Sequence, residues 1–228
     1  MSYLSDNLNK IRTRIASVCT RSNRDVSDVL LIAVSKTKPL SLLEEAYQNG
    51  IRDFGENRVQ EMSQKAESMP SDIRWHMIGH LQKNKVKQAV KYAYLIHSVD
   101  SFALAQTISD EAVKQSKIVS ILLEVNIAGE ESKFGYSASE VLTDISAIAQ
   151  LPNIKIKGLM TIAPYTDVPE NNRCYFRQLK ELSVDIRNKN IDNVTMDILS
   201  MGMSGDFEIA IEEGADMVRV GTSIFGER

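Results

Sequence analysis

Apolar residues recur along the chain in two alternating spacings. Between residues 3 and 19 they stand three or four positions apart (Leu4, Leu8, Ile11, Ile15 and Val18), which predicts an amphipathic helix. Residues 29–36 then form a short β-branched run, VLLIAVSK, typical of a strand buried on both faces. Similar short apolar runs, each a predicted strand, occur at 52–57, 74–79, 94–99, 121–127, 156–163, 195–202 and 217–221.

Helical patterns separate these strands, at 40–49, 57–68, 80–95, 101–116, 137–150, 171–188 and 204–213. Ser139 and Ser204 precede acidic and apolar residues and are predicted helix starts. The alternation predicts a (β/α)8 TIM barrel, an α/β fold, with an extra N-terminal helix over 1–22. The alternative is an open doubly wound sheet, which usually has a glycine-rich turn after its first strand; AVSKTKP has none.

The length is consistent with one barrel. A chain of 228 residues folds to an accessible surface of about 10,400 Å² and buries roughly 70% of its unfolded surface. We therefore expect a single domain over 1–228, with no second domain, that needs no disulfide or structural metal. Cys19 and Cys174 lack C-x-x-C spacing and are expected to be reduced thiols.

Charge and hydropathy exclude several classes of partner. With 27 Lys and Arg against 30 Asp and Glu, nothing indicates a nucleic-acid-binding protein. The first 18 residues are charged throughout and no long apolar run occurs, so neither a signal peptide nor a membrane span is predicted. We expect a cytoplasmic protein, and a monomer, because no exposed apolar stretch requires a partner.

Candidate chemistry lies where the predicted strands end, since active sites of such barrels are built at the carboxyl ends of their strands. Lys36 closes the first strand. It is either a solvated lysine at the start of a loop or a Schiff-base lysine, because partial desolvation at a barrel mouth favours the neutral, nucleophilic amine.

The last two strands end in residues suited to an anion. Small residues and hydroxyls there let backbone N–H groups approach a phosphate, and the loops after strands 7 and 8 are the usual phosphate site of this fold. The alternative is ordinary turn and capping chemistry. The candidate cup residues are Ser200, Gly202, Ser204, Gly221 and Thr222.

An amine at one side and a phosphate cup at the other would span a ligand with an aldehyde and a phosphate, which describes pyridoxal 5'-phosphate (PLP). Arg219, inside the last strand, would then donate to the pyridine nitrogen of this cofactor. The alternative for Arg219 is a structural ion pair with Asp206 or Glu124.

These residues stand in segments that resemble the pyridoxal phosphate homeostasis protein family, from about residue 29 to 226 and in the same order: AVSKTKP, FGENRVQE, WHMIGHLQKNK, LLEVNIAGEESKFG, GLMTIAP and LSMGMSGDFEIAIEEGADMVRVGTSIFG. The resemblance implies a barrel like the alanine racemase N-terminal domain, with PLP held as an aldimine on Lys36. It also implies that Arg219 faces the pyridine nitrogen, that the cup residues bind the phosphate, and that Asn57 lies near the ring.

Three functions are compatible with such a site: a non-enzymatic PLP carrier and regulator, a PLP-dependent amino-acid racemase with Lys36 as base, and a Schiff-base aldolase. In racemases of this kind the opposite base is a tyrosine of a second domain, which we expect to be absent. An arginine at the ring nitrogen also weakens the cofactor as an electron sink. Both points favour PLP homeostasis without robust catalysis, with PLP-dependent apoenzymes or PLP-synthesising enzymes as possible partners.

Two further sets of residues admit more than one interpretation. His76 and His80 are four positions apart, but Gly79 intervenes and no acidic residue supports a zinc site, so no metal is predicted. Glu124 and Asn126 share one face of their strand, where they form either a structural polar layer or part of a ligand site.

Overall fold

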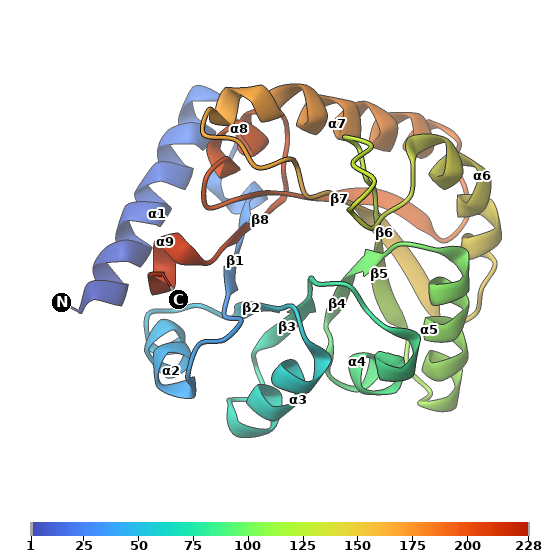
Figure 1. Ribbon diagram of the computed structural model, residues 1–228, viewed down its shortest axis with the longest axis horizontal. Coiled ribbons are helices and arrows are strands. Elements are labelled where there is room, and N and C mark those ends of the chain that lie inside the picture. Colours follow the sequence, from blue (N-terminus) through green and yellow to red (C-terminus); the bar gives the residue numbers. More distant parts are fainter. Residues whose placement is uncertain (1, 228) are drawn as a thin grey trace.

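Strand pairing closes the sheet into a barrel. In residues 2–227, which the computed structural model describes, eight parallel strands pair in chain order and β8 returns to pair with β1 (Figure 1). The predicted (β/α)8 barrel is confirmed, and the open doubly wound alternative is wrong. The strands are β1 (Leu30–Val34), β2 (Asp53–Glu56), β3 (Arg74–Met77), β4 (Leu95–Val99), β5 (Val119–Glu124), β6 (Ile154–Met160), β7 (Val194–Met203) and β8 (Met217–Val220).

Helices fill the connections and cover the outside of the barrel (Figure 1). They are α1 (Tyr3–Arg21), α2 (Leu40–Gln48), α3 (Val59–Ser68), α4 (Val86–Tyr92), α5 (Phe102–Lys114), α6 (Ala138–Ala149), α7 (Arg173–Asn188), α8 (Phe207–Glu212) and α9 (Thr222–Phe225). Single 3-10 turns lie at Val26–Asp28, Lys83–Lys85 and Pro169–Asn172.

Two predicted helix starts are wrong by two residues. Helix α6 begins after Ser137 rather than Ser139, because Ser137 and Glu140 form a reciprocal capping box. Helix α8 begins after Asp206 rather than Ser204. Ser204 therefore stays in the loop after β7, where its hydroxyl is available to the site described below.

The apolar core has two parts. The larger cluster lies between the barrel and its helices. The smaller one comes from strands alone, with Ile32, Leu95, Leu122, Met160 and Met217 in contact, and fills part of the barrel interior. The rest of the interior holds buried polar side chains, which are described with the site.

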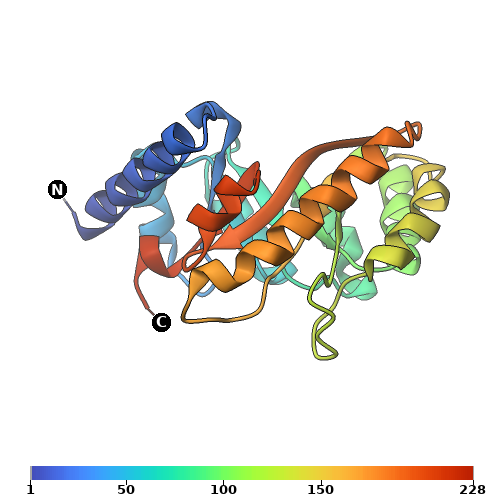
Figure 2. The same ribbon diagram turned by 90° about the horizontal axis from the view of Figure 1, so that it is seen from above.

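The extra N-terminal helix supports the end of the chain. Helix α1 lies alongside α8 and α9 (Figure 2). The buried amide of Asn7 donates to the carbonyl oxygen of Ile224 in α9 at 3.1 Å. Arg14 and Arg21 pair with Glu208 and Glu212 of α8. The helix thus holds in place the two short helices that follow β7 and β8.

Surface properties agree with the size of one barrel. The accessible surface is 10,769 Å², close to the area that the chain length predicts. None of the helices within residues 2–227 is long and apolar enough to cross a bilayer. Cys19 is buried and Cys174 is exposed, and both are free thiols.

Candidate cofactor site

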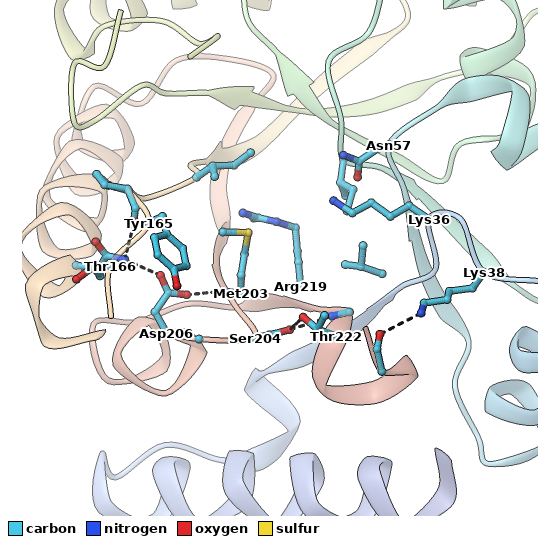
Figure 3. Close-up of a pocket in the computed structure, with 18 residues that line it drawn as sticks. Lys36, Lys38, Asn57, Tyr165, Thr166, Met203, Ser204, Asp206, Arg219 and Thr222 are labelled. Carbon is cyan, nitrogen blue, oxygen red and sulfur yellow. Dashed lines mark hydrogen bonds between the residues drawn. The ribbon is translucent and has the colours of Figure 1, made fainter. Parts of the chain in front are cut away.

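A cavity of about 400 Å³ opens at the carboxyl ends of β1, β2, β7 and β8 (Figure 3). This volume is in the range of small-molecule sites. Of the predicted site residues, the cavity is lined by Lys36, Asn57, Ser204, Arg219, Gly221 and Thr222. Residues from the two ends of the chain therefore line one cavity, as the strand-end argument predicts.

Lys36 follows β1 at a sharp turn. Ser35, just before it, is fully buried, and the backbone N–H of Lys38 donates to the Ser35 carbonyl oxygen at 3.0 Å. Thr37, just after it, has a φ of 63°, which β-branched residues rarely adopt. The turn directs the Lys36 side chain across the cavity toward Asn57 and Arg219 (Figure 3).

A cluster of charged side chains, Lys65, Glu56 and Glu61, holds the backbone of this turn; we call it the Lys65 cluster. Lys65 Nζ donates to the Ser35 carbonyl oxygen at 2.7 Å and to Glu56 Oε1 at 2.8 Å. Glu61, which also contacts Lys65, accepts from the Thr37 backbone N–H at 2.6 Å. Burial raises the pKa of Glu56, although the hydrogen bond from Lys65 opposes the shift. The backbone on both sides of Lys36 is thus fixed by charged side chains.

Asn57 directly follows β2 and faces the cavity from the side opposite β7 (Figure 3). Its backbone packs against Gly79, where a Cβ would lie 2.6 Å from the Asn57 carbonyl oxygen and 2.7 Å from its Cα. Residue 79 must therefore be glycine for Asn57 to keep this position.

Arg219 is buried in the barrel wall and points into the cavity (Figure 3). Nη1 donates to the Ser200 carbonyl oxygen at 2.7 Å and to Ser200 Oγ at 2.6 Å, and Nη2 donates to the Thr161 carbonyl oxygen at 2.8 Å. These bonds use three of the five N–H donors of a guanidinium. Burial lowers the pKa of Arg219 to about 10, with Glu124 and Asp206 opposing.

The acceptors of Arg219 are neutral oxygens. Within residues 2–227 no carboxylate lies at ion-pairing distance from it, so the ion pair considered with Asp206 or Glu124 is not formed. Asp206 is instead held by the Met203 backbone N–H at 2.7 Å and the Asn172 amide at 2.8 Å. Arg219 is therefore a cation with two donors left for a ligand.

The cup consists of the loops after β7 and β8. The Thr222 hydroxyl donates to Ser204 Oγ at 3.3 Å, and the Gly221 N–H donates to the same oxygen at 3.2 Å. Gly205, which the sequence reasoning did not single out, also lines the wall, and a Cβ there would meet no atom within 4 Å. Hydroxyls and backbone N–H groups gather here, as binding of an anion requires.

Two predicted cup residues do not line the cavity. Ser200 is fully buried below it, between Arg219 and His97, and contacts Arg219 directly. Gly202 has a φ of 89°, and a Cβ there would lie 2.5 Å from Ala210 Cβ in α8. Gly202 therefore permits close packing of α8, and its predicted contact with phosphate is not supported by this placement.

A smaller cavity of about 200 Å³ adjoins the first and shares Asn57, Ile78 and Ile162 with it. Glu124, at the end of β5, lines it and is only 7% exposed. Burial raises the pKa of Glu124 to about 7, and the negative charge of Asp100 adds to the shift. Asn126 also lines this cavity and holds the loop after β5, which projects from the barrel in Figure 2, by bonds to the backbone of Glu130.

The two histidines weighed as a zinc pair have different partners. His80 Nδ1 lies 3.0 Å from Asp100, and its ring stacks on Phe134. His76 lies inside the barrel, bonded to Asp53 and His97. Across residues 2–227, His, Cys, Asp and Glu form no group of three that could hold a metal ion.

Comparison with known proteins identifies the family of this chain. The family model for the alanine racemase N-terminal domain matches residues 7–228. A pyridoxal phosphate homeostasis protein of Aquifex aeolicus is 44% identical over 224 residues, covering 98% of this chain and 97% of that protein.

Solved structures place the fold in the same group. PipY of Synechococcus elongatus, in its structure with PLP bound, is 36% identical, with a TM-score of 0.82 over 95% of this chain and 100% of PipY. Alanine racemase of Clostridium difficile is 16% identical, with a TM-score of 0.77 over 99% of this chain and 56% of the racemase, which shows a shared fold. The chain belongs to the pyridoxal phosphate homeostasis protein family.

Proposed function

We propose that this protein binds pyridoxal 5'-phosphate in the cavity at the carboxyl ends of the strands and acts in PLP homeostasis. The observation that carries the proposal is a shared cavity: Lys36, Arg219 and the cup of Ser204, Gly221 and Thr222 line one cavity of about 400 Å³. The PLP-bound PipY structure and the names of the curated relatives support it.

The residues present fit the three functional groups of this cofactor. The PLP aldehyde condenses reversibly with a primary amine and releases one water. Lys36 supplies that amine, from a backbone turn that the Lys65 cluster holds. Hydroxyls and backbone N–H groups for the phosphate would come from Ser204, Gly205, Gly221 and Thr222, and Asn57 would lie near the ring.

Arg219 would donate one of its remaining N–H groups to the pyridine nitrogen. A fixed cation beside that nitrogen disfavours its protonation, which leaves the ring a weaker electron sink. This argument supports binding and release of the cofactor rather than robust catalysis. The racemase alternative, with Lys36 as base, is tested by incubating the PLP-loaded protein with D- and L-alanine and separating the enantiomers by chiral chromatography.

We also propose that the protein exchanges PLP with PLP-dependent apoenzymes or PLP-synthesising enzymes, since its ligand is bound reversibly. We expect it to do so in the cytoplasm and as a monomer.

Absorption spectroscopy tests the proposal. The purified protein should be yellow, or become yellow with PLP, and Lys36→Ala should abolish the band while the surface variant Lys87→Ala keeps it. Borohydride reduction followed by peptide mass spectrometry should place the cofactor on Lys36. A protein that stays colourless after addition of PLP would refute the proposal.

A further inference from the structure

A line of buried polar side chains crosses the barrel interior beneath the cavity. It begins at Arg219 on β8 and passes to Ser200 on β7. His97 Nδ1 on β4 lies 2.9 Å from Ser200 Oγ, and His97 Nε2 lies 2.9 Å from His76 Nδ1 on β3. His76 Nε2 lies 3.0 Å from Asp53 Oδ1 on β2. We call Ser200, His97, His76 and Asp53 the interior chain.

The interior chain ends at the opposite rim of the barrel. Asp53 and Arg74 are the first residues of β2 and β3. Arg74 Nε and Nη2 donate to the two carboxylate oxygens of Asp53 at 2.7 and 2.5 Å. Burial alone would raise the pKa of Asp53, but the bonds from His76 and Arg74 hold it below its usual value. The interior chain therefore ends on an ionised carboxylate, that of Asp53.

That carboxylate determines where every proton lies. Asp53 only accepts, so His76 donates from Nε2, and a neutral His76 then accepts at Nδ1. His97 consequently donates from Nε2 and accepts at Nδ1 from the Ser200 hydroxyl. Ser200 Oγ keeps a lone pair for Arg219 Nη1. All donors point in one direction, from Arg219 to Asp53, and each member has its partners.

Both rings are neutral in this arrangement, which agrees with their surroundings. Burial lowers the pKa of His76, against the opposing effect of Asp53, and burial lowers the pKa of His97 further, aided by His76 and Arg219. Protonation of either ring would turn an acceptor nitrogen into a donor facing another donor. The arrangement thus permits a single orientation of the Ser200 hydroxyl.

We propose that Ser200, His97, His76 and Asp53 are positioning residues that fix the Arg219 guanidinium, so that its two unused N–H donors face the cavity. The role for the cofactor rests on the proposed function, because it assumes that those donors meet the pyridine nitrogen. Oriented hydrogen bonds that end on a carboxylate strengthen one another in a buried, low-dielectric setting, so a change at Asp53 is transmitted to Arg219.

The proton positions can be tested without any cofactor. The protein's 228-residue sequence has 3 histidines, so long-range 1H–15N spectra of the 15N-histidine-labelled, ligand-free protein resolve each ring. We expect His76 and His97 to be neutral with the proton on Nε2 near neutral pH, with the half-exposed His80 as internal reference. A proton on Nδ1 of either buried ring, or an imidazolium, would overturn the inference. Failure of PLP to bind would refute only the proposed function.

Variants test the link to Arg219. Ser200→Ala removes the hydroxyl between His97 and Arg219, and should shift the Nδ1 resonance of His97 and weaken PLP binding by about tenfold, the equivalent of one hydrogen bond. Ser200→Thr, which keeps the hydroxyl, should restore both. Ser109→Ala is the control: it removes the hydrogen bond that the buried Ser109 hydroxyl donates to the Pro152 carbonyl oxygen. It should change neither the His97 Nδ1 resonance nor the affinity for PLP.

The cofactor itself reports on the far end of the interior chain. With 15N-pyridine-labelled PLP bound, Asp53→Asn should move the pyridine 15N resonance, although Asp53 lies at the other rim. Asp72→Asn, which alters an exposed aspartate paired with Arg52, should leave that resonance in place. Equal spectra for Ser200→Ala and the wild type, or equal shifts in both aspartate variants, would show that the interior chain only fills the barrel.

Discussion

The ammonium group of Lys65 lies 2.7 Å from the carbonyl oxygen of Ser35, the residue immediately before Lys36. Lys65 belongs to α3 and Ser35 follows β1, so a helix cation holds the end of a neighbouring strand. Lys65 is only 6% exposed. Its burial is tolerated because Glu56 and Glu61 pair with it. The position of the Lys36 backbone thus depends on a charge 29 residues further along the chain.

Replacing Lys65 should cost both stability and cofactor binding. Lys65→Met keeps the length of the side chain but leaves Glu56 buried without its cation, a change that typically costs about 3–5 kcal/mol. The Ser35 carbonyl also loses its donor, so Lys36 becomes less well placed. Urea unfolding should give the lower stability, and titration with PLP should give a weaker or slower rise of the visible band.

Lys87→Met is the matched control, because Lys87 is exposed on α4. It should unfold at the same urea concentration as the wild type and bind PLP equally well. If Lys65→Met is destabilised but forms the visible band with unchanged affinity and rate, then the Lys65 cluster supports the fold only and does not position Lys36.

Lys36 and Arg219 could be predicted from the sequence, whereas the role of Lys65 could not. Strand-end positions identified Lys36 and Arg219, because barrel geometry places the ends of parallel strands at one rim. Lys65 lies in the segment 57–68, where the helical pattern is weak, so its burial could not be predicted with the same force. The available signal was its position, three residues after Met62 and six after Val59, on the buried face of α3.

Ser200 and Gly202, predicted for the phosphate cup, do not line the cavity, for a related reason. Both are small residues beside a predicted phosphate loop, and small residues serve turns, close packing and anion binding equally well. Strand β7 continues to Met203, so both residues lie within the strand, Ser200 among buried polar groups. The pairing of His97 with His76 could not be predicted either, because it requires the register of strands 21 residues apart.

Glu124 should make the stability of the ligand-free protein depend on pH. Its folded-state pKa of about 7 lies above the value of 4.5 in an unfolded chain. Between these values the folded protein holds a proton that the unfolded chain has lost, so the free energy of unfolding falls as pH rises from 4.5 to about 7. Above that range both states are ionised and the decline stops.

Glu124→Gln removes this titration. Relative to the wild type, the variant should gain up to about 3 kcal/mol of stability between pH 5 and pH 8, since each pKa unit corresponds to roughly 1.4 kcal/mol. Urea unfolding at the two pH values measures the difference. Glu44→Gln, at an exposed position on α2, should show the same difference from wild type at both. A gain at pH 8 no larger than that at pH 5 would mean that Glu124 is ionised throughout.

Gly79 should be needed for the position of Asn57. In Gly79→Ala the new Cβ would lie 2.6 Å from the Asn57 carbonyl oxygen. This oxygen belongs to the backbone, which cannot move aside as easily as the end of a flexible side chain. We expect a loss of about 1–3 kcal/mol in stability and weaker PLP binding. Asn57→Ala, which removes the side chain but keeps the glycine contact, separates the two effects: it should weaken binding with little change in unfolding. PLP binding by Gly79→Ala at wild-type affinity would show that Asn57 has no part in holding the ring.

Gly202, buried near the end of β7, and Gly205, in the loop that follows, should respond differently to the same substitution. Gly202→Ala places a Cβ 2.5 Å from Ala210 Cβ at a positive φ, so α8 must move and stability should fall by about 1–3 kcal/mol. Gly205→Ala places its Cβ where no atom lies within 4 Å, so the free energy of unfolding should change by less than about 0.5 kcal/mol.

Because Gly205 lines the cavity, its new methyl group occupies space at the cup, and the affinity for PLP should fall. Thermal unfolding and PLP titration of both variants measure the four quantities. Equal stability of the two variants would contradict the packing role of Gly202, and unchanged affinity in Gly205→Ala would place the phosphate away from the loop after β7.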